Sequence, residues 1–103
     1  MIHSHICLVC GYKGLDEAPY DILGNCSYEI CSCCGFQFGV DDDDYDENGT
    51  MLTSKEELHT TYRKSWISTG AKAFSDYYPK KWLNRDGSLK DSVLTAQFEN
   101  IVI

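Results

Sequence analysis

The sequence has no long apolar segment and few basic residues. No apolar run approaches the roughly 20 residues that a helix needs to cross a bilayer, so we expect no membrane span. With 9 Lys and Arg against 16 Asp and Glu, the formal net charge is −7, and Lys13 is the one Lys or Arg among the first 50 residues. Because a phosphate backbone repels such a surface, we expect a basic protein partner or an electron-transfer partner rather than a nucleic acid.

The sequence also lacks the patterns of an enzyme or a secreted protein. There is no glycine-rich phosphate loop, and no nucleophile stands with a His and an acid in a recognisable arrangement, so we expect no catalytic activity. The first six residues contain no basic stretch followed by an apolar run, so we expect a cytoplasmic location. In that reducing compartment, cysteines favour metal ligation over disulfides.

What the sequence does have is two Cys-x-x-Cys pairs. Cys7 and Cys10 form the first pair, and Cys31 and Cys34 form the second. Each pair runs directly into a Gly and an aromatic residue, a segment that we call a knuckle. Two residues between thiolates let a tight turn aim both sulfurs at one ion, and the Gly lets the chain fold back. The spacing therefore predicts a closed four-thiolate site, which is typical of structural zinc.

Further potential ligands lie near these pairs. They are Cys33, Cys26, His3 and His5. The spacing of Cys33 to either neighbour in the second pair is cramped, so we place it beside the site rather than among the ligands. We expect Cys26 to be a small buried or turn residue. The two histidines are expected to be solvated, and one of them replacing a Cys ligand is the alternative.

The first half of the chain predicts short strands around the metal site. Residues 27–31 and 36–40 alternate in character, so we expect a strand on each side of the second pair. Phe36 and Phe38, together with Tyr12, would then shield the metal. Because this half has few aliphatic runs, we expect the ion to supply much of its folding free energy.

The second half predicts two helices. Ser54 and Glu57 form a capping-box pattern at the start of a helix over residues 55–69. Its core-facing stripe would be Leu58, Tyr62 and Trp66, with His59 off that stripe. Ser88 and Asp91 form a second capping pattern before a helix over residues 89–99. Lys80, Lys81 and Arg85 form a basic cluster that we expect to balance carboxylates of the protein itself.

An acidic run occupies residues 41–47, and we interpret it as a solvated loop that could meet a basic partner. An alternative is a calcium site, because Asp44, Asp46, Asn48 and Gly49 match the first half of an EF-hand loop. The twelfth position of that loop requires a bidentate Glu, and here it is Lys55.

At CLVCGYKGL and SYEICSCCGF, and in the acidic residues that follow, the sequence resembles the bacterial cysteine-rich CPCC family. That resemblance implies a zinc-ribbon-like module with Cys7, Cys10, Cys31 and Cys34 as ligands. It also implies a module sometimes found among immunity proteins of bacterial toxin systems. The two knuckles are similar to those of rubredoxins as well, which hold one iron in four thiolates and transfer single electrons.

Together these patterns predict an α+β protein, a single domain over residues 1–103. Residues 1–50 would form a small zinc-ribbon or rubredoxin-like β-hairpin module, and residues 51–103 a helical portion packed against it. The expected function is that of a non-enzymatic protein with structural zinc, acting as an acidic protein-binding module such as an immunity-type partner of a basic toxin. The alternatives are a one-electron carrier with iron and a nucleic-acid-binding zinc ribbon.

Overall fold

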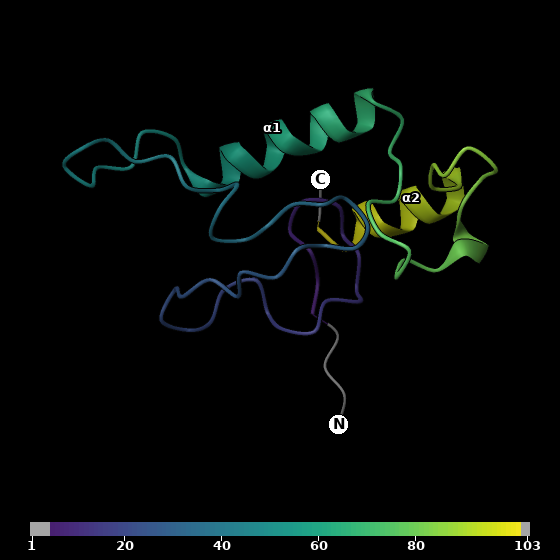
Figure 1. Cartoon of the computed structure of the whole chain (residues 1–103), viewed down its shortest axis with the longest axis horizontal. Helices are drawn as coiled ribbons and strands as arrows, with labels where there is room; N and C mark the ends of the chain where they lie inside the picture. Colours follow the sequence, from purple (N-terminus) through teal and green to yellow (C-terminus); the bar gives the residue numbers. More distant parts are fainter. Residues whose placement is uncertain (1–4, 102–103) are drawn as a thin grey trace.

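The computed structural model describes residues 5–101, which form two α-helices and a short 3₁₀ helix joined by irregular chain. Helix α1 spans Lys55–Ser68, the 3₁₀ helix η1 spans Lys80–Trp82, and α2 spans Asp91–Glu99. Both α-helices lie beside the loops of the N-terminal half (Figure 1). Within the described residues no helix has both the length and the apolar character needed to span a membrane.

The two strands predicted around the second cysteine pair are not formed. Residues 27–31 and 36–40 form one isolated bridge, between Ile30 and Gln37, instead of a ladder. Beyond that bridge the chain turns at Gly39, whose φ of 96° lies in the left-handed region. The N–H groups of Val40 and Asp41 both donate to Gln37 O (3.2 and 2.9 Å), so the chain forms a turn here and the ladder does not continue. Across residues 5–101, β structure consists of such isolated bridges.

Helix α1 begins and ends close to the predicted bounds. The Ser54 hydroxyl accepts a hydrogen bond from the Glu57 N–H (3.1 Å), as its capping role requires. Two glutamates in the first turn favour the helix dipole. The helix ends at Ser68, and Gly70 follows with a φ of 107°. The capping and stop signals in the sequence therefore located this helix to within one residue.

The buried face of α1 differs from the predicted stripe. His59 and Trp66 are the buried residues of this helix, whereas Leu58 is half-buried. The imidazole of His59 packs edge-on against the rings of Phe36 (5.2 Å between centroids) and Phe38 (6.0 Å). The prediction that His59 lies off the core face is wrong, because the rings of Phe36 and Phe38 cover it.

Helix α2 begins two residues later than the predicted range of 89–99, at Asp91. Ser88 does not cap it, because its hydroxyl and its N–H both donate to the Asp86 carboxylate (2.5 and 2.9 Å) and hold a turn. Leu89 is buried outside the helix and forms a bridge with Leu83. Ser88 therefore belongs to the turn at Asp86 instead of capping the helix, and the helix begins further along the chain.

A single hydrophobic cluster surrounds the cysteines. Its buried members are Cys7, Val9, Cys10, Leu15, Cys31, Cys33, Cys34, Phe36, Phe38, Trp66, Ala71, Tyr78 and Leu89. Most of these residues precede position 40, so the core lies in the cysteine-containing half and is built from thiols and aromatic rings rather than aliphatic runs. The chain after position 50 supplies the remaining members and covers this core.

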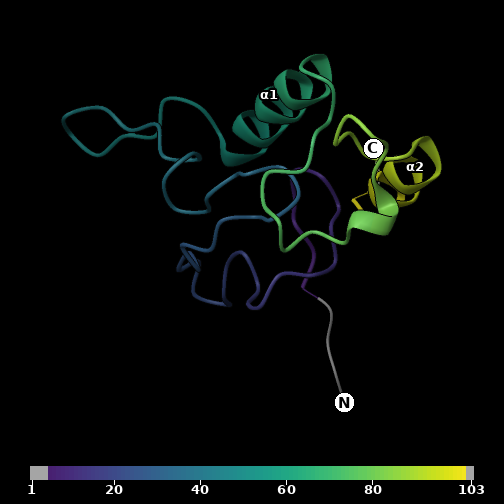
Figure 2. The same ribbon diagram turned by 45° about the vertical axis from the view of Figure 1, so that its right-hand side comes forward.

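A hairpin-like arm projects from the body of the protein just before α1 (Figures 1 and 2). It comprises residues 43–52 and is closed by a bridge between Tyr45 and Met51. The Asp46 N–H donates to Thr50 O (2.9 Å), and the Leu52 N–H donates to Asp44 O (2.8 Å). The second half of the acidic run therefore lies on an ordered projection.

Candidate metal centre

The two knuckles, residues 7–12 and 31–36, share one backbone conformation. In the first, the Cys7 N–H donates to Tyr12 O and the Gly11 N–H donates to Cys7 O, both at 2.8 Å. The second repeats both bonds with Cys31, Phe36 and Gly35, at 3.0 and 2.9 Å. Each pair of cysteines is therefore held on the same tight turn, and the sequence repeat is a structural repeat.

Both turns require glycine after the second cysteine. Gly11 has a φ of 81° and Gly35 a φ of 82°, in the region where a side chain is strained. A Cβ on Gly11 would lie 1.8 Å from Gln97 O, and one on Gly35 would lie 2.5 Å from the Phe74 ring. The glycines thus permit the turn and also the close approach of later parts of the chain.

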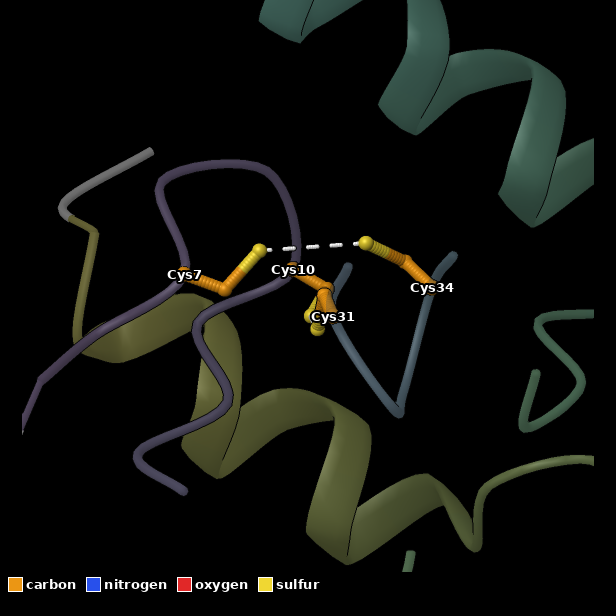
Figure 3. Close-up of side chains that lie close together, drawn as sticks. All are labelled: Cys7, Cys10, Cys31 and Cys34. Carbon is orange, nitrogen blue, oxygen red and sulfur yellow. Dashed lines mark hydrogen bonds between the residues drawn. The ribbon is translucent and has the colours of Figure 1, made fainter. Parts of the chain in front are cut away.

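The four predicted ligands lie together. The Sγ atoms of Cys7, Cys10, Cys31 and Cys34 are all within 4.8 Å of one another, and the side chains converge from two separate loops (Figure 3). The Cys7–Cys34 and Cys10–Cys31 sulfur pairs are each 3.7 Å apart. A tetrahedral site with metal–sulfur bonds of about 2.3 Å has sulfur–sulfur edges of about 3.8 Å. The four cysteines can therefore hold a metal ion, and zinc and iron both accept this donor set.

The cysteine cluster is buried, which shapes its electrostatics. None of the four residues is more than 4% exposed. Burial raises the pKa of the Cys10 thiol, whereas hydrogen bonds from the thiols of Cys10, Cys34 and Cys7 lower the pKa of Cys31. A divalent cation among the sulfurs would offset the mutual repulsion of four buried thiolates, which is why metal affinity at such sites depends on pH.

Helix α1 holds both knuckles through side chains that the sequence did not single out as site residues. The Arg63 guanidinium donates from Nε to Val9 O (2.6 Å) and from Nη2 to Leu8 O (3.0 Å). The Tyr62 hydroxyl donates to Cys34 O (3.0 Å). Burial raises the pKa of Tyr62 to about 12, so this donor keeps its proton. One helix therefore positions both halves of the cluster.

Helix α2 holds the first knuckle from another side. The buried Gln97 donates from Nε2 to Cys10 O (3.1 Å) and accepts the Tyr78 hydroxyl at Oε1 (2.6 Å). Asn100 donates from Nδ2 to Gly11 O (2.9 Å). No sequence pattern indicated these amides, because their acceptors are backbone carbonyls almost ninety positions away.

The other potential ligands lie outside the four-sulfur group. Cys33 is fully buried, and its Sγ is 3.5 Å from Gln97 Nε2. Cys26 is partly buried and forms a bridge with Tyr20, and His5 forms bridges near the first knuckle. His3 lies outside the described residues. Within residues 5–101 the cysteine cluster is the one group of three or more His, Cys, Asp or Glu side chains close enough to share an ion.

One residue of the acidic run is not solvated. Asp42 is 1% exposed and accepts hydrogen bonds from the Tyr20 hydroxyl and from the Gly39 N–H (2.8 Å). Lys55 Nζ lies 3.8 Å from its Oδ1, and His59 Nε2 lies 3.0 Å from the Tyr20 hydroxyl. The interpretation of residues 41–47 as a solvated loop is therefore wrong at Asp42, which joins the second knuckle to α1.

The calcium alternative finds no support in the arm. Asp46 Oδ1 accepts hydrogen bonds from the N–H groups of Asn48 and Thr50 (both 2.9 Å), which uses this oxygen to hold the turn. Lys55, at the twelfth loop position, pairs with Asp42 instead of closing a loop. Among the described residues the acidic run supplies no group that could hold a cation.

The basic cluster does not balance carboxylates. In the part of the chain that the structure describes, Lys55 forms an ion pair with Asp42 and His59 lies 4.0 Å from the same carboxylate, and neither contact involves Lys80, Lys81 or Arg85. Lys81 Nζ instead lies 5.8 Å from the centroid of the Trp82 ring, within cation–π range. The expectation of internal pairing is wrong for this cluster.

The fold and site define a small two-helix protein with a four-cysteine cluster that can hold a metal ion. The chain is 35% identical over 100 residues to the uncharacterized protein YoaQ of Bacillus subtilis strain 168, a match covering 92% of the chain and 84% of the relative. It is 34% identical over 103 residues to the uncharacterized protein YozI of the same organism, covering 94% and 84%. The chain therefore belongs to the family of these two proteins.

No family model matches the chain, so the resemblance to the CPCC family stays a prediction. No solved structure matches it either, so the zinc-ribbon or rubredoxin-like character of the cysteine half rests on the knuckles alone.

Proposed function

We propose that the protein is a non-enzymatic binding protein whose four-cysteine site holds a structural zinc ion. The main observation in support is that the site is closed. The four sulfurs lie within 4.8 Å of one another, and each of the four cysteines is at most 4% exposed. Catalytic zinc needs an open position for water or substrate, and four protein ligands leave none. The ion would fasten two loops that have few aliphatic residues of their own.

Iron is the alternative metal, and the burial of the cluster argues against it. A one-electron carrier benefits from a metal centre close to the surface that meets its partner. Here α1 and α2 both hold the knuckles, and Phe36 and Phe38 are fully buried in the same core. This enclosure suits a structural ion better than a redox centre.

The partner that we propose is a basic protein, by analogy with the immunity proteins that the CPCC resemblance suggests. The net charge of −7 would attract such a partner over a distance. The arm of residues 43–52 would present carboxylates together with the exposed side chains of Tyr45, Met51 and Leu52. Exposed apolar side chains on a charged projection provide contact area for a protein partner.

Elemental analysis of the purified protein tests the metal assignment. We expect one zinc ion per chain and no visible absorption, because zinc has a filled d shell. One iron ion per chain, with visible absorption from thiolate-to-iron charge transfer, would refute the structural-zinc proposal and favour an electron carrier. A protein purified under reducing, chelator-free conditions with no metal would refute both.

Co-purification at two salt concentrations tests the partner. We expect a basic protein to be retained at low salt and released at high salt, because screening weakens the long-range attraction. A variant with Asp43→Asn and Glu47→Gln on the arm should retain less of it than one with Asp76→Asn and Glu99→Gln, which removes the same charge elsewhere. Equal retention by the two variants would exclude the arm, and retention of nucleic acid alone would favour the nucleic-acid alternative.

A further inference from the structure

A cleft of about 530 Å³ lies between the first knuckle and α2. Gly11 and Gly14 form part of one wall, and Val93 and Ala96 form part of the other. The volume falls in the range of roughly 300–1,000 Å³ that is typical of small-molecule sites. Neither the four-cysteine site nor the acidic arm uses this cleft.

Two aromatic side chains line the cleft, and a third fixes their positions. Tyr12 and Trp82 both pack on the buried ring of Tyr78, with centroid distances of 5.1 and 5.8 Å. The Tyr78 hydroxyl is itself held by Gln97 (2.6 Å). Trp82 keeps 36% of its surface exposed although it is a large apolar residue. Rigid aromatic surfaces that are exposed in a concave site are suited to stacking against a flat ring.

The charge of the cleft differs from that of the whole protein. Among the described residues that line it there is one cation, Lys13, and no carboxylate, although acidic residues outnumber basic ones by 16 to 9. Lys81 lies over the Trp82 ring at 5.8 Å and adds a second cation nearby. A small anion would therefore meet less repulsion here than over the acidic arm.

We propose that this cleft is a binding site for a small planar aromatic anion, such as an aromatic carboxylate. The ring would stack on Tyr12 and Trp82, and the anionic group would face Lys13. Because Gln97 and Asn100 hold the two walls together through Cys10 O and Gly11 O, the cleft is preformed wherever the first knuckle is ordered. This binding activity goes beyond the proposed function and does not depend on which metal is bound.

Titration of the metal-loaded protein with 2-naphthoate, followed by ¹H–¹⁵N NMR, tests the proposal. We expect the Trp82 indole N–H and the amides of Gly11 and Gly14 to shift with saturation. The Trp66 indole N–H, which donates to Lys72 O (2.9 Å) beneath α1, is an internal reference and should not shift. The neutral 2-naphthamide should bind about threefold more weakly, because it loses the attraction to an exposed cation.

Two variants of one helix locate the site. Ala96 and Thr95 are both exposed, and only Ala96 lines the cleft. Ala96→Glu should weaken 2-naphthoate binding by about tenfold or more, because it places a carboxylate against the anion. Thr95→Glu adds the same charge at the adjacent position and should leave the affinity within about twofold. A Lys13→Gln variant should lose the preference for naphthoate over naphthamide.

The proposal is overturned if 2-naphthoate causes no saturable shift at millimolar concentration. It is also overturned if the neutral amide binds as tightly as the anion, or if Ala96→Glu and Thr95→Glu reduce affinity equally. A cleft that binds naphthoate in protein found to carry iron would support the site while refuting the structural-zinc proposal, so the two can fail separately.

Discussion

The two knuckles have the same internal hydrogen bonds but are attached to the protein in different ways. Four carbonyls of the first knuckle accept hydrogen bonds from three side chains: those of Arg63 in α1, Gln97 in α2 and Asn100 directly after α2. The second is attached mainly by backbone bonds, with the Phe74 N–H donating to Ser32 O (3.1 Å) and Cys33 O (2.9 Å). The motif therefore specifies the turn, and the surroundings specify where the turn sits.

The aromatic surroundings differ in the same way. Phe36 of the second knuckle lies at the centre of a ring cluster, 5.0 Å from Phe38 and 5.0 Å from Tyr62. Tyr12, at the matching position of the first, is only half-buried and lines a cleft. The aromatic residue of the second knuckle is thus fully buried, whereas that of the first is only partly buried, and the first knuckle is held by more side-chain hydrogen bonds. This difference leads to four predictions.

The largest effect should come from removing a ligand from either knuckle. Cys10→Ser and Cys34→Ser should each abolish stoichiometric metal binding and unfold the cysteine half, because structural zinc contributes on the order of 10 kcal/mol to folding. Metal content and thermal unfolding measured by circular dichroism would show this. Cys26→Ser is the matched control, since Cys26 lies outside the four-sulfur group, and it should keep one ion per chain. Full metal content in Cys10→Ser would contradict the four-ligand site.

Substitution of the knuckle glycines should destabilise the protein to different extents. Gly11→Ala should cost more than about 3 kcal/mol, because its Cβ would overlap the backbone of Gln97 at 1.8 Å and α2 would have to move. Gly35→Ala should cost less, since its Cβ meets the ring of Phe74, a side chain that is 62% exposed and can rotate away. Chemical denaturation of both variants measures the difference.

Gly49→Ala provides the reference for that comparison. No atom lies within 4 Å of its added Cβ, so it should show only the cost of a left-handed φ, roughly 1–2 kcal/mol. An equal loss in Gly11→Ala and Gly49→Ala would mean that α2 does not press on the first knuckle.

Removing the side-chain hydrogen bonds to the knuckle carbonyls should have the next largest effect on stability. Arg63→Met removes two hydrogen bonds to knuckle carbonyls and should cost about 2 kcal/mol, whereas Tyr62→Phe removes one neutral bond and should cost about 1 kcal/mol. Arg63→Met should also weaken zinc affinity more than Tyr62→Phe, because only the first loosens residues 8 and 9 between two ligands. Competition with a chromophoric chelator measures zinc affinity, and the opposite ranking would show that α1 positions the second knuckle instead.

Local signals explain what the sequence could predict. The turn chemistry of the two Cys-x-x-Cys-Gly segments lies within each segment, and sharing one ion brings the segments together. The start of α1 follows from Ser54 and Glu57, three residues apart. These features depend on residues that are close together in the chain, so they can be predicted from a single sequence.

Contacts between residues far apart in the chain explain what the sequence could not predict. Arg63 and Gln97 donate to backbone carbonyls, which have no side-chain identity for a pattern to match. The helical spacing around His59 does not predict its burial, because the rings that cover it, Phe36 and Phe38, come from a distant part of the chain. The bridge at Ile30 does not extend into a strand because residues 37–41 form a turn, in which the N–H groups of Val40 and Asp41 donate to Gln37 O.

The smallest effect should be a pH dependence that belongs to the second knuckle. Burial lowers the pKa of His59 below its usual value of about 6.5, and the nearby Asp42 only partly opposes this shift. The unfolded chain therefore binds a proton more readily than the folded one. Stability should fall as the pH drops from above 6.5 toward the folded-state pKa, because protonation then favours unfolding.

His59→Gln isolates that contribution from acid release of the metal. Both proteins should lose stability when thiolates are protonated, but only the wild type should show the additional decline that begins near pH 6.5. Denaturation of the zinc-loaded forms between pH 7.5 and the onset of metal release gives the difference between the two slopes. NMR shifts of the folded protein, measured as the pH approaches the lowered pKa of His59, should concentrate at Phe36 and Phe38 and leave Gly11 unchanged, because the imidazole packs on those two rings. Parallel slopes would show that His59 is not the group that titrates.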